Sequence, residues 1–123
     1  MARQTLIQAF SHATDGIRLA ARERNFKIEL GFGVAAIVLG ILFGITPTEW
    51  AVIAVCIGCV LGGECLNTAL EALVDLVSPD FNKLAKTAKD CAAGAVLLSS
   101  VASLFVAAFI FLPKMLTVAL SFL

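Results

Sequence analysis

Five polar residues in an otherwise apolar stretch have the types and spacing of a catalytic cluster: Glu64, Asn67, Thr68, Glu71 and Asp75. On a helix that turns about 100° per residue, these positions fall within one sector, so three carboxylates and an amide share a face. A carboxylate in a low-dielectric environment accepts a proton readily, whereas carboxylates nearer to water bind hard cations such as Mg²⁺. The cluster therefore indicates proton abstraction from an alcohol beside a site for a metal-bound phosphate.

The charge pattern indicates that membrane-spanning helices position this cluster. The chain has 123 residues, of which 60% are hydrophobic and 15% are charged, whereas soluble domains average roughly 45–50% and 25%. No ionisable residue occurs over 30–48 or 91–113, and helices of these lengths measure about 28 and 34 Å, enough to cross the hydrocarbon core. Residues 50–63 alone would span only about 21 Å. The middle helix must therefore carry Glu64 into the membrane.

The N-terminal segment has a different periodicity. Apolar residues recur there at spacings of three and four: Leu6, Phe10, Ala13, Ile17 and Ala20. With arginines on another face, this pattern predicts an amphipathic helix over 5–25 at the membrane surface. Three transmembrane helices follow at 29–47, 50–70 and 91–112. We expect an all-α membrane protein with a single domain over residues 1–123.

Basic residues predict the orientation of these helices. Eight of them flank the first span or lie between the second and third: Arg3, Arg18, Arg22, Arg24, Lys27, Lys83, Lys86 and Lys89. Only Lys114 lies on the other side. The positive-inside rule therefore places the N-terminus and the 77–90 loop in the cytoplasm and the C-terminus outside. Acidic and basic residues balance, so no net positive field exists to bind nucleic acid.

Two other interpretations of the acidic row remain open. Such residues can simply hold helices together, or they can form a proton-coupled transport path. A transport path does not need Glu71 and Asp75 at the cytoplasmic end, near three lysines that can neutralise phosphates. Phosphoryl transfer does need that arrangement.

Three sequence motifs resemble those of the small prokaryotic membrane lipid kinases, the bacterial diacylglycerol kinases and undecaprenol kinases. They are ECLNTALE at 64–71, continued by Asp75, then SPDF at 78–81 and AKDCAAGAV at 88–96. The resemblance implies a surface helix, three transmembrane helices and a homotrimer whose active sites lie between subunits. It also implies ATP as co-substrate and Mg²⁺ as cofactor.

The resemblance also implies roles for individual residues. Glu64 matches the general base that faces the lipid hydroxyl, and Asn67 matches the neighbouring active-site amide. Glu23 and Glu71 match the metal-binding acids. The positions that match the ATP site as a whole are Glu23, Glu71, Asp75, Asp80, Phe81, Asn82, Lys89 and Asp90.

The segment RNFK at 24–27 and the Ser-Pro pair at 78–79 look more like the undecaprenol kinases of Gram-positive bacteria. We therefore expect an enzyme of the bacterial plasma membrane that phosphorylates undecaprenol to undecaprenyl phosphate. Diacylglycerol, giving phosphatidic acid, is the alternative substrate. A small proton-coupled transporter and a purely structural membrane protein are the alternatives without kinase activity.

Overall fold

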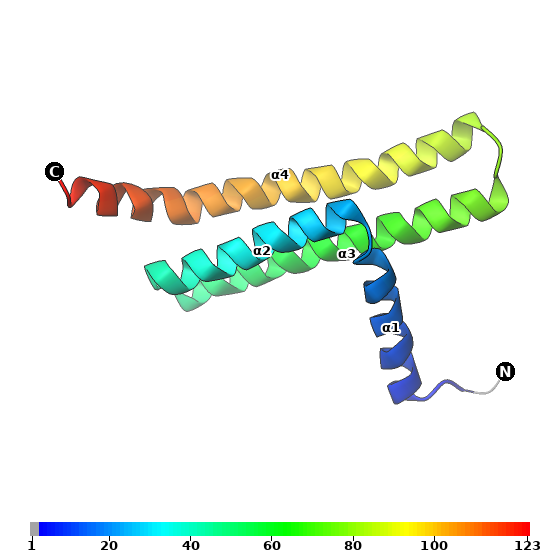
Figure 1. Cartoon of the computed structure of the whole chain (residues 1–123), viewed down its shortest axis with the longest axis horizontal. Coiled ribbons are helices and arrows are strands. Elements are labelled where there is room, and N and C mark those ends of the chain that lie inside the picture. Colours follow the sequence, from blue (N-terminus) through cyan, green and yellow to red (C-terminus); the bar gives the residue numbers. More distant parts are fainter. Residues whose placement is uncertain (1–2) are drawn as a thin grey trace.

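The computed structural model describes residues 3–123, which form four helices and no strand. The helices are α1 (Leu6–Ala20), α2 (Arg24–Phe43), α3 (Pro47–Val77) and α4 (Lys83–Leu120) (Figure 1). Each of the last three is long and apolar enough to cross a membrane. The predicted all-helical fold with three candidate spans is thus confirmed. Because α3 and α4 extend beyond the charge-free segments, the membrane boundaries within them stay a prediction.

A tight turn joins α2 to α3. Gly44 ends α2 in the left-handed conformation, with φ of 60°, which costs glycine little. Thr46 then caps α3 in a reciprocal pair of hydrogen bonds with Glu49. Gly40 lies against Trp50 so closely that a Cβ atom there would be 2.7 Å from a ring carbon. The small residue at 40 therefore lets α2 and α3 pack tightly at this end.

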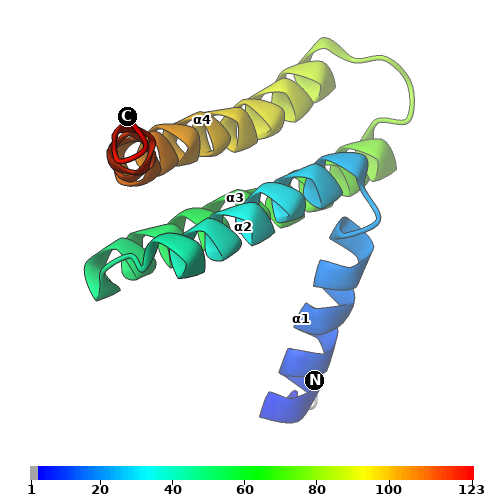
Figure 2. The same cartoon turned by 60° about the vertical axis from the view of Figure 1, so that its left-hand side comes forward.

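The apolar core lies at the end of the bundle that contains this turn. Ile45, Ile53, Ile110 and Phe111 are buried together there. Lys114 forms an ion pair with Glu49 at 2.9 Å beside them. At the opposite end, α3 and α4 continue past the start of α2 as a two-helix hairpin (Figures 1 and 2). Residues 65–91 of this hairpin include no buried residue.

Helix α1 runs at a steep angle to the other three helices (Figures 1 and 2). Thr5 and Gln8 form a capping box at its start, and Ala20 is fully buried at its other end. Its apolar residues Leu6, Phe10 and Ile17 are exposed. This arrangement leaves an apolar face free to lie on a membrane surface.

Candidate active site

Glu64 is the one charged side chain that is buried among residues 3–123, with 3% of its surface exposed. It lines a cavity of about 240 Å³ between α2, α3 and α4. A water molecule needs only about 10–15 Å³ of such space, so the cavity admits larger groups. Its other polar lining residues are Asn25, Glu29, Asn67 and Ser100. Two of the sequence-predicted residues, Glu64 and Asn67, therefore share one cavity.

The amide of Asn67 has a defined orientation. Its Nδ2 donates a hydrogen bond to Oε1 of Glu71 at 3.2 Å, and the opposite orientation would bring two oxygen atoms together. Its Oδ1 is buried and accepts no hydrogen bond within residues 3–123. Buried acceptors usually have a hydrogen-bond donor as a partner. This oxygen is therefore suited to accept a hydrogen bond from a bound molecule.

Two other carboxylates are linked to the cavity of Glu64. Glu29 lines this cavity, and Glu71 accepts a hydrogen bond from Asn67, which also lines it. Glu23 is the residue before α2 and is exposed, whereas Glu71 is half-buried on α3. Carboxylates near one cavity provide oxygen ligands that suit a cation.

The side chains of Glu23 and Glu71 end in carboxylates, the chemical group that binds magnesium in proteins. Mg²⁺ prefers oxygen ligands and usually takes one or two protein carboxylates, with water and phosphates completing its shell. In the described part of the chain, no three His, Cys, Asp or Glu side chains form a metal-binding group. The match of Glu23 and Glu71 to this ion lies in the type of their ligand atoms.

Two ion pairs lie on the α3–α4 hairpin beyond Glu71. Lys89 on α4 pairs with Asp75 on α3, so the structure brings together two of the residues predicted to contact ATP. Asp90 instead pairs with Lys86 along α4. These exposed pairs keep two lysine ammonium groups on the surface of the hairpin, where phosphate oxygens can reach them.

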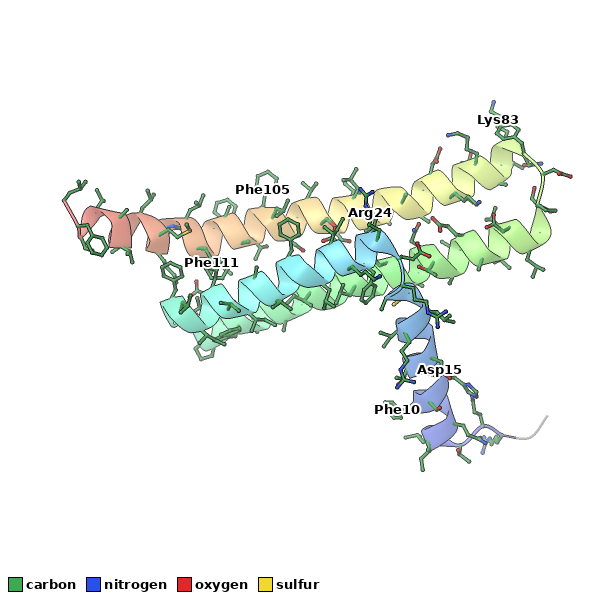
Figure 3. All side chains as sticks on the ribbon, in the orientation of Figure 1. Phe10, Asp15, Arg24, Lys83, Phe105 and Phe111 are labelled. Atoms are coloured by element: carbon green, nitrogen blue, oxygen red, sulfur yellow. The ribbon has the colours of Figure 1, made fainter. Side chains whose placement is uncertain are left out.

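Asp80, Phe81 and Asn82 lie at the tip of the hairpin, close to Lys83, which Figure 3 labels. From Glu64 to the end of α3 at Val77, the helix rises about 20 Å, so the structure does not gather these three residues around Glu64. Phe81 is 86% exposed. Asn82 caps α4 by accepting hydrogen bonds from the backbone N–H groups of Leu84 and Ala85, which gives it a structural role.

Glu29 and Ser100 are site residues that the sequence motifs did not reveal. Ser100 Oγ on α4 donates a hydrogen bond to Glu29 Oε1 on α2 at 2.9 Å, and both residues line the cavity of Glu64. In the sequence, Glu29 marks the start of the first span and Ser100 lies within the third. The spacing of Ser100 and Ser103, one helical turn apart in an apolar span, is a signal that could have revealed this face.

A second cavity of about 150 Å³ adjoins the first. Its lining is mostly apolar and includes Phe32, Ala36, Ile53 and Leu104, together with Glu29 and Ser100. Along α2 it extends from Glu29 to Ala36, a rise of about 10 Å. An apolar chain lying in this space would point its end at the cavity of Glu64.

Comparisons with known proteins agree with one another. The family described as "Prokaryotic diacylglycerol kinase" matches residues 11–111. An "Undecaprenol kinase" of Bacillus subtilis (strain 168) is 42% identical over 109 residues, covering 88% of this chain and 89% of that protein. A "Diacylglycerol kinase" of Synechocystis sp. is 43% identical over 114 residues, 91% of this chain and 65% of that protein. A third relative, a "Diacylglycerol kinase" of Sinorhizobium sp., is 32% identical over 105 residues, 85% of this chain and 77% of that protein.

Proposed function

This chain belongs to the prokaryotic diacylglycerol kinase family, and from that premise we propose that it transfers the γ-phosphoryl group of ATP to the hydroxyl of undecaprenol. The protein is a lipid kinase of a bacterial membrane. The relative that matches over nearly its whole length with 42% identity is named for undecaprenol. Family membership does not support the transporter or the purely structural protein considered from the sequence.

The observation that supports this proposal is that the two cavities share the lining residues Glu29 and Ser100. The apolar cavity suits the chain of a lipid, and the adjoining cavity holds the buried carboxylate of Glu64. A lipid alcohol bound in this way presents its hydroxyl to Glu64, which removes the proton. The hydroxyl oxygen forms a bond to the γ-phosphorus as the bond to the β–γ bridging oxygen breaks, and ADP leaves.

Glu23 and Glu71 are the residues proposed to hold Mg²⁺. Bound there, the ion would neutralise negative charge on the phosphates of ATP. Asn67 keeps Glu71 in place through its amide hydrogen bond. Lys89, Asp75 and Asp90 then lie along the path of the nucleotide, with Asp80, Phe81 and Asn82 at the nucleoside end.

We further propose that three copies associate along α3. One face of this helix is exposed over its whole length and repeats every seven residues in two series: Val52, Cys59, Leu66 and Leu73, and Val55, Gly62, Ala69 and Leu76. Apolar or small residues at two positions of a heptad are typical of helices that pack against copies of themselves. The number three follows from the resemblance to the family.

Oxidation of a variant that retains only Cys59 should produce disulfide-linked dimers in native membranes. A shared α3 interface brings Cys59 residues of neighbouring copies within the roughly 4.4–6.8 Å between Cα atoms that a disulfide requires. A variant that retains only Cys56, which lines the apolar cavity, is the matched control and should stay monomeric. Non-reducing gel electrophoresis distinguishes the two. Cross-linking of Cys56 but not Cys59 would place the interface on another face.

The proposed orientation has the N-terminus and the hairpin tip in the cytoplasm and the C-terminus outside. It rests on the eight basic residues of that side. It also gives the hairpin access to cytoplasmic ATP. Inverted membrane vesicles should therefore use externally added ATP, whereas sealed vesicles of native orientation should not.

Phosphate transfer to competing lipids tests the proposed substrate. Purified protein in mixed micelles receives labelled ATP, Mg²⁺ and either undecaprenol or diacylglycerol at matched surface concentrations. We expect a larger kcat/KM for undecaprenol. A larger value for diacylglycerol, the substrate in the names of two relatives, would make that lipid the preferred substrate. Transfer to neither lipid would rule out both substrates.

A further inference from the structure

Glu29 and Ser100 are the only two residues that line both cavities described above. Their hydrogen bond is also the only one between side chains of α2 and α4 within residues 3–123. It therefore joins the two helices at the point where the apolar cavity meets the cavity of Glu64. Neither residue was assigned a role by motif.

We propose that Ser100 is a positioning residue for the lipid substrate: its hydroxyl fixes the carboxylate of Glu29 at the passage between the cavities, and this placement determines how well the lipid alcohol binds. The inference rests on the proposed function and adds a residue that acts before the chemical step. Ser100 acts through Glu29 and takes no part in proton transfer.

The chemistry of the passage supports this role. A carboxylate beside mostly apolar walls is costly to desolvate and needs a hydrogen-bond donor. Ser100 supplies that donor at 2.9 Å, which holds Glu29 toward α4. Without the hydroxyl, the carboxylate of Glu29 forms hydrogen bonds to water or to another donor within the space through which the lipid must pass. The lipid then binds more weakly, whereas the ion pairs of Lys86 and Lys89 on the hairpin are unaffected.

Kinetics of three Ser100 variants test the proposal. In Ser100→Ala and Ser100→Val, KM for the lipid alcohol should rise about tenfold, which corresponds to 1.4 kcal/mol. In these variants KM for ATP should stay within about twofold of the wild type, and kcat should fall by a smaller factor than the lipid KM rises, since a lost hydrogen bond at the passage affects binding. Ser100→Thr has the shape of the Val variant but keeps a hydroxyl, so it should restore the lipid KM.

Ser99→Ala is the matched control, because Ser99 is the adjacent half-buried serine of α4 and lines neither cavity. It should leave the lipid KM unchanged. Thermal unfolding of every variant separates positioning from stability, since a merely structural role would lower Tm without a selective effect on lipid KM. An unchanged lipid KM in the Ala and Val variants, or equal values for Thr and Val, would overturn the proposal.

Binding without ATP separates this inference from the proposed function. A photoreactive polyprenol should label residues of the apolar cavity such as Phe32 and Leu104 in the wild type, and labelling should fall about tenfold in Ser100→Val but not in Ser100→Thr. If this pattern occurs and no phosphate is transferred, the kinase proposal fails and the positioning role stands. If phosphate is transferred and labelling is equal in all variants, the positioning role fails.

Discussion

Glu64→Gln should reduce phosphorylation of the lipid by a factor of about 100 or more, because general base catalysis commonly contributes 10² to 10⁴-fold. The substitution keeps the size of the side chain and an oxygen that accepts hydrogen bonds, but it removes the capacity to take a proton from the alcohol. Transfer of labelled phosphate in mixed micelles at saturating ATP and lipid measures the effect.

The same variant should fold and bind ATP at least as well as the wild type. Glu64 is buried, and replacing a buried charge by a neutral amide removes its cost of desolvation. Equal or higher thermal stability together with lost activity therefore indicates catalysis. Asp15→Asn, the same chemical change on the exposed surface of α1, is the control and should retain full activity. Turnover of the Glu64 variant within a few-fold of the wild type would show that this carboxylate is not the base.

Glu71→Gln should raise the Mg²⁺ concentration needed for half-maximal activity about tenfold or more, since weakening even the outer contacts of a metal site commonly costs 10–100-fold in affinity. The amide still offers an oxygen to Asn67, whose hydrogen bond to Glu71 then persists and keeps the helix face intact. Magnesium titrations at fixed ATP measure the shift.

Excess Mg²⁺ should partly restore the activity of this variant, which distinguishes a metal ligand from a general base. Asp15→Asn again serves as the control and should titrate as the wild type does. Full activity of Glu71→Gln at ordinary Mg²⁺ concentrations would show that Glu71 is not a metal ligand. Its hydrogen bond with Asn67 would then be its only assigned role.

The sequence predicts the helices well because the cost of burying charge in a membrane dominates their placement. Two long charge-free segments define two of the spans, and the short middle segment requires Glu64 to enter the third. The spacing of polar residues along that helix likewise predicts that Glu64 and Asn67 lie close together, and both line one cavity. Each of these predictions depends only on the sequence of a single helix.

Contacts between helices were not predictable in this way. Glu29 and Ser100 are 71 residues apart, and Glu49 and Lys114 are 65 residues apart. Each pair depends on how two helices are rotated against each other, which the periodicity of either helix does not determine. The cap that Asn82 forms on α4, by contrast, is local to residues 82–85, and it was missed because the motif assigned this residue to the nucleotide.

The uneven distribution of buried residues has a consequence for motion. Ile45, Ile53, Ile110 and Phe111 are packed together at one end, whereas residues 65–91 of the hairpin have no buried side chain. Local opening therefore costs less in the hairpin than beside the core, and the backbone amides of the hairpin exchange with solvent sooner. A ligand that bridges α3 and α4 there suppresses this opening, and part of its binding free energy is spent on the lost conformational freedom. The rigidity of the two-helix hairpin thus depends on what binds to it.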